Sequence, residues 1–227
     1  MKNKIITVDG PAASGKEKIA KYISKNLRFK HLDSGLLYRR LAFILDNNKI
    51  DFNNSFEIKN EINKIKKFSY QKSKKIRTQK ISKLASKIAI HDFVREYINN
   101  LQYQFVKKYK NNRGFVVDGR DIGSVVFKNA DLKLYIDVNS EIRAKRRYKQ
   151  LIDSGEKSIY PTILKEIELR DQKDKFRKNS PLVIPEDAYI INNNGTFKDT
   201  IKQIREIITL IWVNKSTIKL ATLNTKH

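Results

Sequence analysis

A glycine-rich segment near the start of the chain constrains the fold more than any other feature of the sequence. The apolar run at residues 5–9 predicts a β-strand, and the apolar spacing of residues 19–27 predicts a helix. Between them lies the pattern Gly-x4-Gly-Lys, from Gly10 to Lys16. Between a strand and a helix, this pattern is typical of a loop that wraps a chain of phosphates. The alternative is an ordinary glycine-rich turn.

This loop combines three sources of positive potential. Its backbone N–H groups point inward, the helix N-terminus adds partial charge, and Lys16 adds a full charge for the terminal phosphates. Glycine allows the backbone to approach the ligand closely. We expect the phosphates of a nucleoside triphosphate to be bound by Gly10, Pro11, Ala12, Ala13, Ser14, Gly15, Lys16, Glu17 and Lys18.

The two residues after the lysine depart from the usual pattern. The complete motif has Ser or Thr directly after the lysine, whereas this chain has Glu17 and Lys18. A carboxylate suits the first turn of a helix. At roughly 6 Å from a phosphate, with an effective dielectric near 20, it would cost about 3 kcal/mol. That cost is avoided if Glu17 points outward or Lys18 offsets its charge.

The composition excludes several classes of site. The chain has no cysteine, so it has neither a disulfide nor a thiolate metal site. Its histidines, at positions 31, 91 and 227, are scattered, which argues against a catalytic zinc site. No apolar run reaches the roughly 18 residues of a membrane helix. We expect a cytoplasmic protein that does not bind membranes.

The formal net charge of +24 has two interpretations. One is a nucleic-acid-binding protein. The other is a lysine-rich habit, with charges spread over exposed helix faces. The lysines run throughout the chain without forming a compact basic arm. This distribution favours the second interpretation, and we expect no specific nucleic-acid partner.

Strand and helix patterns alternate along the chain. Buried-type strands are predicted at residues 5–9, 31–33, 115–118, 132–138 and 189–192. Apolar residues recur at helical spacing within 94–105 and 201–211, and 141–151 predicts a basic helix. Residues 1–227 therefore predict a single α/β domain with a central parallel sheet of about five strands and helices on both faces. We expect residues 213–227 to form a loose tail.

Five further segments resemble bacterial cytidylate kinase, a family of P-loop nucleoside monophosphate kinases. They contain the sequences LDSGLLYR, IRT, VDGRDIGSVVF, RAKRRY and RDQKDKFR, in that order. The resemblance extends over about residues 5–192. It implies a three-layer P-loop kinase fold and transfer of the γ-phosphoryl of ATP to CMP or dCMP, with Mg²⁺ and a monomeric enzyme. A catalytically impaired nucleotide-binding protein of the same fold is the alternative, because of Glu17 and Lys18.

The resemblance also implies the acceptor site. Guanidinium groups bind a monophosphate bidentately, and a carboxylate can accept from the cytosine amine. The implied acceptor residues are Ser34, Tyr38, Arg39, Arg77, Arg120, Asp121, Asp174 and Arg177. Taken singly, each of these side chains could instead have a purely structural role. Arg39 could be an exposed helix charge, Arg77 could pair with Asp92 or Glu96, and Asp174 could pair with a neighbouring lysine.

Phosphoryl transfer requires positioning and charge neutralisation. The resemblance implies a mobile lid at residues 143–177, and the implied catalytic cations are Lys16, Arg120, Arg143, Arg146 and Arg170. Asp118 is expected either to hold Mg²⁺ through water or to cap a strand end. The monophosphate-binding insertion, at 52–76, is expected to be shorter than is usual in the family. Lys173 and Lys175 stand where arginines are usual.

Overall fold

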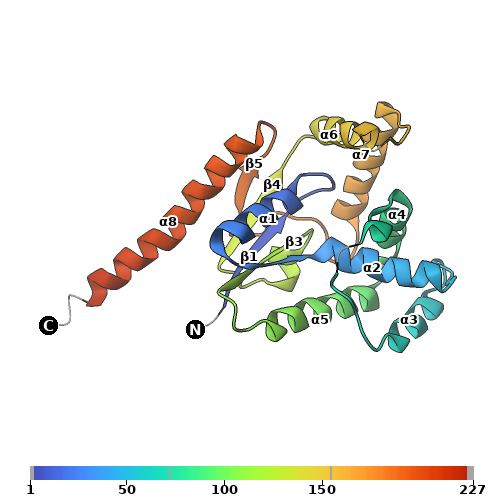
Figure 1. The fold of residues 1–227 in the computed structure, drawn as a ribbon, viewed down its shortest axis with the longest axis horizontal. Helices are drawn as coiled ribbons and strands as arrows, with labels where there is room; N and C mark the ends of the chain where they lie inside the picture. The colour runs from blue at the N-terminus through green and yellow to red at the C-terminus, as the bar shows by residue number, and fades with distance from the viewer. Residues whose placement is uncertain (1–2, 72, 154, 224–227) are drawn as a thin grey trace.

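A single parallel sheet organises the protein. The computed structural model describes residues 3–71, 73–153 and 155–223, and it describes side chains as far as Trp212. The sheet has five strands in the order β2-β3-β1-β4-β5 (Figure 1). The strands are β1 (Lys4–Asp9), β2 (Lys30–Asp33), β3 (Gly114–Gly119), β4 (Leu132–Asp137) and β5 (Tyr189–Asn192). All five predicted strands, and their parallel arrangement, are confirmed.

The register aligns the carboxyl ends of the strands at one edge. Asp9 of β1 pairs with Gly119 of β3, and Asp33 of β2 pairs with Asp118 of β3. Ligands bind beyond this edge in open α/β sheets. The glycine-rich loop and the segments that begin at Ser34 and Arg120 therefore converge at the edge where a ligand is expected.

Helices fill the connections between the strands. The α-helices are α1 (Lys16–Leu27), α2 (Ser34–Asn47), α3 (Ser55–Lys64), α4 (Gln79–Ile88), α5 (Asp92–Lys108), α6 (Ser140–Asp153), α7 (Tyr160–Phe176) and α8 (Phe197–Leu223). A short 3₁₀-helix, η1 (Lys74–Arg77), precedes α4, and a π-helical turn, η2 (Ile122–Val126), follows β3. Side-chain caps define several starts: Asp33 accepts from the backbone N–H of Leu36, and Thr78 accepts from that of Ile81.

Two hydrophobic cores lie on opposite faces of the sheet. Phe115 and Val117 of β3 belong to the core that includes α2, α4 and α5. Val116 belongs to the core that includes α1 and α8. Successive side chains of a strand point to opposite faces, so this alternation places helices on both sides. The predicted three-layer architecture is confirmed.

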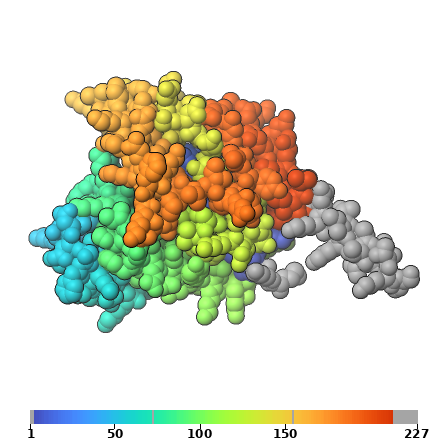
Figure 2. Space-filling view, turned by 180° about the vertical axis from the view of Figure 1, so that it is seen from behind, coloured from blue at the N-terminus to red at the C-terminus, as the bar shows by residue number. Residues whose placement is uncertain are grey.

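Helices α6 and α7 pack around a small core of their own. That core consists of Ala144, Leu151, Ile163 and Ile167, with Tyr160 and Leu164 packed against it. The two helices lie together at one end of the molecule (Figure 1). Figure 2 shows α7 and the segment after it, in orange, across one face of the protein between the green residues and the red α8.

Two regions bear on the predicted domain boundaries. Residues 52–76 contain α3 and most of η1, and no strand lies within their described part. Helix α8 continues through the first part of the predicted tail, to Leu223, and residues 224–227 lie outside the described residues. Every helix within the described ranges is too short or too polar to cross a lipid bilayer.

Candidate active site

The glycine-rich loop has the backbone that its sequence requires. Gly15 has a φ of 83°, in the left-handed region, and it is the N-cap of α1. A Cβ added at Gly10 would lie 2.7 Å from the carbonyl oxygen of Ile136, so β4 leaves no room for a side chain there. The loop therefore turns tightly from β1 into α1, and the N-terminus of α1 faces the space beyond the sheet edge.

Lys16 is buried at the start of α1. Its Nζ donates to the carbonyl oxygen of Pro11 over 2.9 Å. Burial lowers the pKa of Lys16 well below its usual range, and the nearby cations Arg120 and Arg170 lower it further. An anion bound among Lys16, Arg120 and Arg170 would stabilise the charged form of Lys16.

Glu17 and Lys18 turn toward different partners. The Glu17 carboxylate accepts hydrogen bonds from Arg77 over 2.7 and 3.1 Å, and it pairs with Lys21 over 2.7 Å. Burial alone would raise the pKa of Glu17, but the hydrogen bonds from Arg77 and Lys21 lower it to about 2. The Nζ of Lys18 lies 4.0 Å from the centre of the Phe197 ring. Arg77 and Lys21, rather than Lys18, neutralise Glu17.

Asp33, at the end of β2, contacts two arginines of the predicted acceptor site. One carboxylate oxygen accepts the backbone N–H of Leu36 over 2.9 Å. The other accepts from Arg39 over 2.9 Å and from Arg77 over 3.4 Å. Arg39 is thus paired rather than solvated, and Arg77 pairs with Glu17 and Asp33 instead of Asp92 or Glu96.

Asp174 of α7 lies between two further arginines. It accepts from the Nε of Arg120 over 3.0 Å and from Arg177 over 3.5 Å. Burial would raise the pKa of Asp174, but the charges of Arg120, Arg170 and Arg177 hold it below its usual range. Its partners are therefore arginines from the predicted acceptor site, and not neighbouring lysines.

Arg170 supplies an excess positive charge to this cluster. Within the described part of the chain its side chain makes no hydrogen bond or ion pair, and its buried Nε has no partner. Burial and the neighbouring Arg120 lower the pKa of Arg170 to about 10. The Nε of Arg39 and the Nη2 of Arg177 are also buried without partners. Buried donors without acceptors are costly, so this arrangement is suited to an anionic ligand.

Asp121 is engaged by an arginine that the sequence analysis did not identify. Arg95 of α5 donates to Asp121 and, over 3.0 Å, to the carbonyl oxygen of Ala89. Tyr38 lies nearby, and burial raises its pKa to about 12. Arg95 occupies the buried face of α5 together with Ile98 and Gln102. In the sequence, the position of Arg95 on the apolar face of this helix is the one feature that indicates a buried arginine.

The remaining residue of the predicted acceptor site, Ser34, begins α2 beside the end of β3. A Cβ added at Gly119 would lie 3.3 Å from the Ser34 Oγ, so Ser34 is next to the segment that carries Arg120. The structure therefore brings all the predicted acceptor residues to the carboxyl edge of β2 and β3 or to the adjoining helices.

Asp118 lies at the same edge, and a histidine engages it. His31 Nε2 and Asp118 Oδ1 are 2.6 Å apart. Burial raises the pKa of Asp118, whereas His31 and Lys16 act in the opposite direction. Within the described ranges, no group of three histidine or acidic side chains is arranged to hold a metal. A magnesium ion held by one carboxylate and by substrate phosphates does not require such a group.

Arg143 and Arg146 connect α6 to the glycine-rich loop and to the segment after β5. Arg143 is buried and donates to the carbonyl oxygens of Val138 and Ala12 over 3.0 and 3.1 Å, and to Asp171 over 2.5 Å. Arg146 donates to the carbonyl oxygen of Asn193 over 2.8 Å. In this structure both arginines bind protein groups at the rim of the glycine-rich loop.

Comparison with known proteins identifies the family. A family model described as cytidylate kinase matches residues 6–211. The chain belongs to the cytidylate kinase family. A cytidylate kinase from Fusobacterium nucleatum is 37% identical over 92% of this chain and 98% of its own length. One from Thermosipho africanus is 38% identical over 89% of this chain and 93% of its own.

Solved structures agree with the fold. The crystal structure of TT1252 from Thermus thermophilus has a TM-score of 0.51 to this protein at 13% sequence identity. It covers 93% of this chain and 99% of the Thermus chain. At that identity the likeness extends to the fold alone. The P-loop kinase architecture itself follows from family membership over residues 6–211 and from the five-stranded parallel sheet with the glycine-rich loop between β1 and α1.

Two further residues of this cytidylate kinase family member make buried hydrogen bonds next to the glycine-rich loop. The buried carboxylate of Asp9 accepts the backbone N–H groups of Ile122 and Gly123 over 2.9 and 2.7 Å. Asn193 donates to the carbonyl oxygen of Ser14 over 2.8 Å. Sequence analysis did not assign a role to either one, although Asp9 directly precedes the glycine-rich loop.

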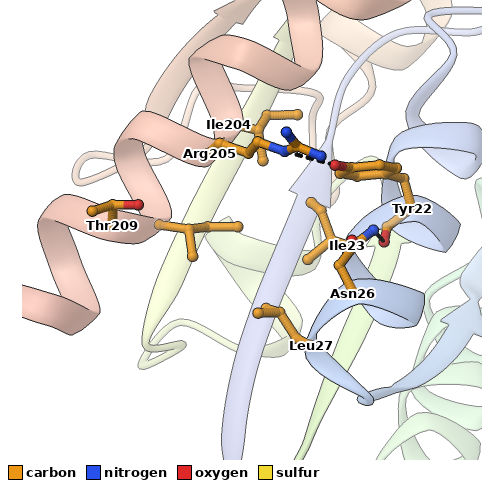
Figure 3. Close-up of a pocket in the computed structure, with 8 residues that line it drawn as sticks. Tyr22, Ile23, Asn26, Leu27, Ile204, Arg205 and Thr209 are labelled. Carbon is orange, nitrogen blue, oxygen red and sulfur yellow. Dashed lines mark hydrogen bonds between the residues drawn. The ribbon is translucent and has the colours of Figure 1, made fainter.

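A separate pocket lies between α1 and α8 (Figure 3). Its volume is about 200 Å³, and Tyr22, Leu27 and Ile204 contribute to its lining. Arg205 donates to the Tyr22 hydroxyl over 2.8 Å at its edge. The pocket is lined by α8 and by the second half of α1, away from the glycine-rich loop. None of the predicted site residues of the cytidylate kinase is among its lining residues.

Proposed function

We propose that this protein transfers the γ-phosphoryl of ATP to CMP or dCMP, producing ADP and the corresponding nucleoside diphosphate. The observation that carries the proposal is the unpaired Arg170 cation, which lies with Arg120 close enough to Lys16 to lower its pKa. The phosphoryl group that passes between two nucleotides is negatively charged, and it would therefore neutralise these cations. Family membership, over residues 6–211, supports cytidine as the acceptor nucleoside.

The donor nucleotide is assigned to residues 10–18. The backbone N–H groups at the start of α1 would bind the phosphates of ATP, and Lys16 would move from the carbonyl oxygen of Pro11 to the terminal phosphates. This movement is favoured because the Lys16 ammonium would exchange a neutral carbonyl oxygen for an anionic phosphate oxygen. The charge of Glu17 is neutralised by Arg77 and Lys21, so it need not repel the donor.

The acceptor nucleotide is assigned to the arginine cluster opposite the loop. Arg39, Arg77 and Arg177 would hold the monophosphate, and the buried nitrogens of Arg39 and Arg177 are available to it. Asp121 and Asp174 would accept from the cytosine amine, while Ser34 and Tyr38 would line the site. Arg120 would connect the two nucleotides, because it contacts Asp174 and lies near Lys16.

Residues 143–177 would act as a lid over the transferred group. Helices α6 and α7 have a core separate from the two sheet cores, so they can move as a unit. Arg170 would neutralise the charge on the phosphoryl, while Arg143 and Arg146 would fix the base of the lid to the loop. Closure would exclude water and suppress hydrolysis of ATP.

Magnesium would be held by the donor phosphates and by Asp118 through water. The buried carboxylate lies near Lys16, and His31 fixes one of its oxygens. A divalent cation there would neutralise phosphate charge. We also propose that the enzyme acts as a monomer, because every group assigned to the two nucleotide sites comes from one chain.

A panel of acceptors tests this function. Formation of ADP from ATP and Mg²⁺ would be measured with CMP, dCMP, UMP, AMP and GMP. We expect turnover with CMP or dCMP, and at least roughly tenfold lower kcat/KM with the purine nucleotides. If the protein bound CMP without producing CDP, it would be the catalytically impaired relative. A preference for AMP or GMP would refute the acceptor assignment.

A further inference from the structure

The Glu17–Arg77 ion pair connects the donor loop to the acceptor side of the site. Glu17 lies on the first turn of α1, and Arg77 ends η1, 60 residues later in the sequence. Nη2 of Arg77 lies 2.7 Å from one oxygen of Glu17, and Nη1 lies 3.1 Å from the other. Both terminal nitrogens of this arginine are therefore occupied by one carboxylate.

Arg77 also belongs to the cluster around Asp33. Its Nη2 is 3.4 Å from the Asp33 oxygen to which Arg39 donates over 2.9 Å. The charges of Asp33 and Asp118, at the ends of β2 and β3, also act on Arg77. A phosphate bound between Arg39 and Arg77 would therefore meet the guanidinium that Glu17 occupies.

The Glu17–Arg77 pair is accessible enough to exchange. The side chains of Arg77 and Glu17 are 39% and 28% exposed, whereas those of the Arg95–Asp121 pair are each 6% exposed. A monophosphate dianion carries more charge than a carboxylate, and it can accept hydrogen bonds from the same two terminal nitrogens of Arg77. Glu17 keeps its contact with Lys21, at 2.7 Å, if Arg77 leaves it. Exchange therefore leaves no isolated charge.

We propose that Glu17 competes with the acceptor phosphate for Arg77, and so lowers the affinity for CMP while leaving the affinity for ATP unchanged. This inference depends on the proposed function. The acidic residue that departs from the usual loop pattern acts on the acceptor side. Binding of CMP must displace the Glu17 carboxylate, which weakens CMP binding.

A double-mutant cycle tests the competition. The affinities for CMP and for a non-hydrolysable ATP analogue would be measured by calorimetry for the wild type, E17Q, R77A and the double variant. Glutamine keeps the size of glutamate and removes the charge. We expect E17Q to tighten CMP binding by roughly threefold to tenfold, with less than a roughly twofold change for the ATP analogue. In the R77A background, the effect of E17Q on CMP affinity should disappear.

Controls separate this competition from other effects of the charge. E206Q removes an exposed charge on α8 and should leave the CMP affinity unchanged. Steady-state kinetics of E17Q should show a lower KM for CMP and an unchanged KM for ATP, a split that a general loss of structure would not produce. E17A provides a second variant if glutamine perturbs the fold.

Several outcomes would overturn the inference. E17Q could leave CMP binding unchanged or weaken it, it could tighten only the binding of the ATP analogue, or it could act equally in the R77A background. Any of these, in an enzyme that phosphorylates CMP, rejects the competition and leaves the proposed function intact. A wild-type protein that neither binds nor phosphorylates CMP rejects both.

Discussion

The Nε of Arg120 donates to Oδ2 of Asp174 over 3.0 Å, and this contact joins the end of β3 to α7. Asp174 is also shared with Arg177, at 3.5 Å. A single carboxylate therefore holds two cations of the proposed acceptor site while α7 contributes a third, Arg170. Asp174 therefore helps to position Arg120 and Arg177, which also donate to the carbonyl oxygens of Gly119 and Ser180.

Removal of the Asp174 charge should impair use of the acceptor. D174N keeps the shape of the side chain but leaves Arg120, Arg170 and Arg177 to repel one another. We expect kcat/KM for CMP to fall by roughly 10- to 100-fold, or about 1.4 to 2.7 kcal/mol. Binding of an ATP analogue should change much less. Equal losses on the donor and acceptor sides would argue against a role on the acceptor side.

Lys16 should be required for turnover. Its Nζ rests on the carbonyl oxygen of Pro11, and burial next to Arg120 lowers its pKa. K16A removes the charge proposed to stabilise the transferred phosphoryl, so kcat should fall by at least about 100-fold. K16R keeps a charge and should retain more activity than K16A. Production of ADP measures both variants, and a K16A enzyme with near-normal kcat would contradict the assignment.

Arg143 should contribute to stability as well as to activity. Its guanidinium binds two backbone carbonyls and Asp171, and its side chain is buried. R143A leaves Asp171 without this partner, so we expect a loss of roughly 3 to 5 kcal/mol in the free energy of unfolding. R147A, in which an exposed hydrogen bond to Gln150 is lost, is the matched control on α6 and should change stability by less than about 0.5 kcal/mol. Denaturant titration compares the two, and equal effects would contradict the role of the Arg143 contacts.

Asp9 should make stability depend on pH. Burial raises the pKa of Asp9 from 3.8 to about 7, against the lowering effect of its bonds to Gly123 and Ile122. The folded chain keeps this proton to a higher pH than the unfolded chain. Asp9 therefore lowers the free energy of unfolding as pH rises from about 4 to about 7, by at most about 1.4 kcal/mol per pH unit.

The D9N variant removes this titration. Its stability relative to the wild type should increase as pH rises from about 5 to about 8, with most of the change below about pH 7. In D9N, the asparagine NH₂ would face a backbone N–H that now donates to Asp9, and this clash lowers stability by the same amount at every pH. It therefore does not change how the stability difference between D9N and the wild type varies with pH. Denaturant titrations across the range provide the measurement. A wild-type-to-variant difference that does not vary with pH would contradict the assignment.

The sequence predicted which charged residues gather at the sheet edge better than it predicted their ionic partners. Glu17 illustrates the difference. Its position after Lys16 predicted repulsion from the donor phosphates unless the side chain pointed outward or Lys18 offset its charge. The structure instead directs its carboxylate to Arg77 and Lys21. Arg95 is a related case. Its spacing on α5 indicated a buried helix face, but only the fold shows that Asp121 lies next to that face.

The sequence by itself determined the five strands, the glycine-rich loop and the family of the chain, because these depend on local patterns of apolar residues, glycines and short motifs. Tertiary structure alone decided which charges meet. Glu17 and Arg77 are 60 residues apart, and His31 and Asp118 are 87 apart. The parallel sheet brings such distant segments to one edge, and for a buried pair such as His31 and Asp118 the choice of ionic partner is energetically decisive. Local sequence cannot specify that choice, because each charged side chain could pair with several others until the strands are ordered.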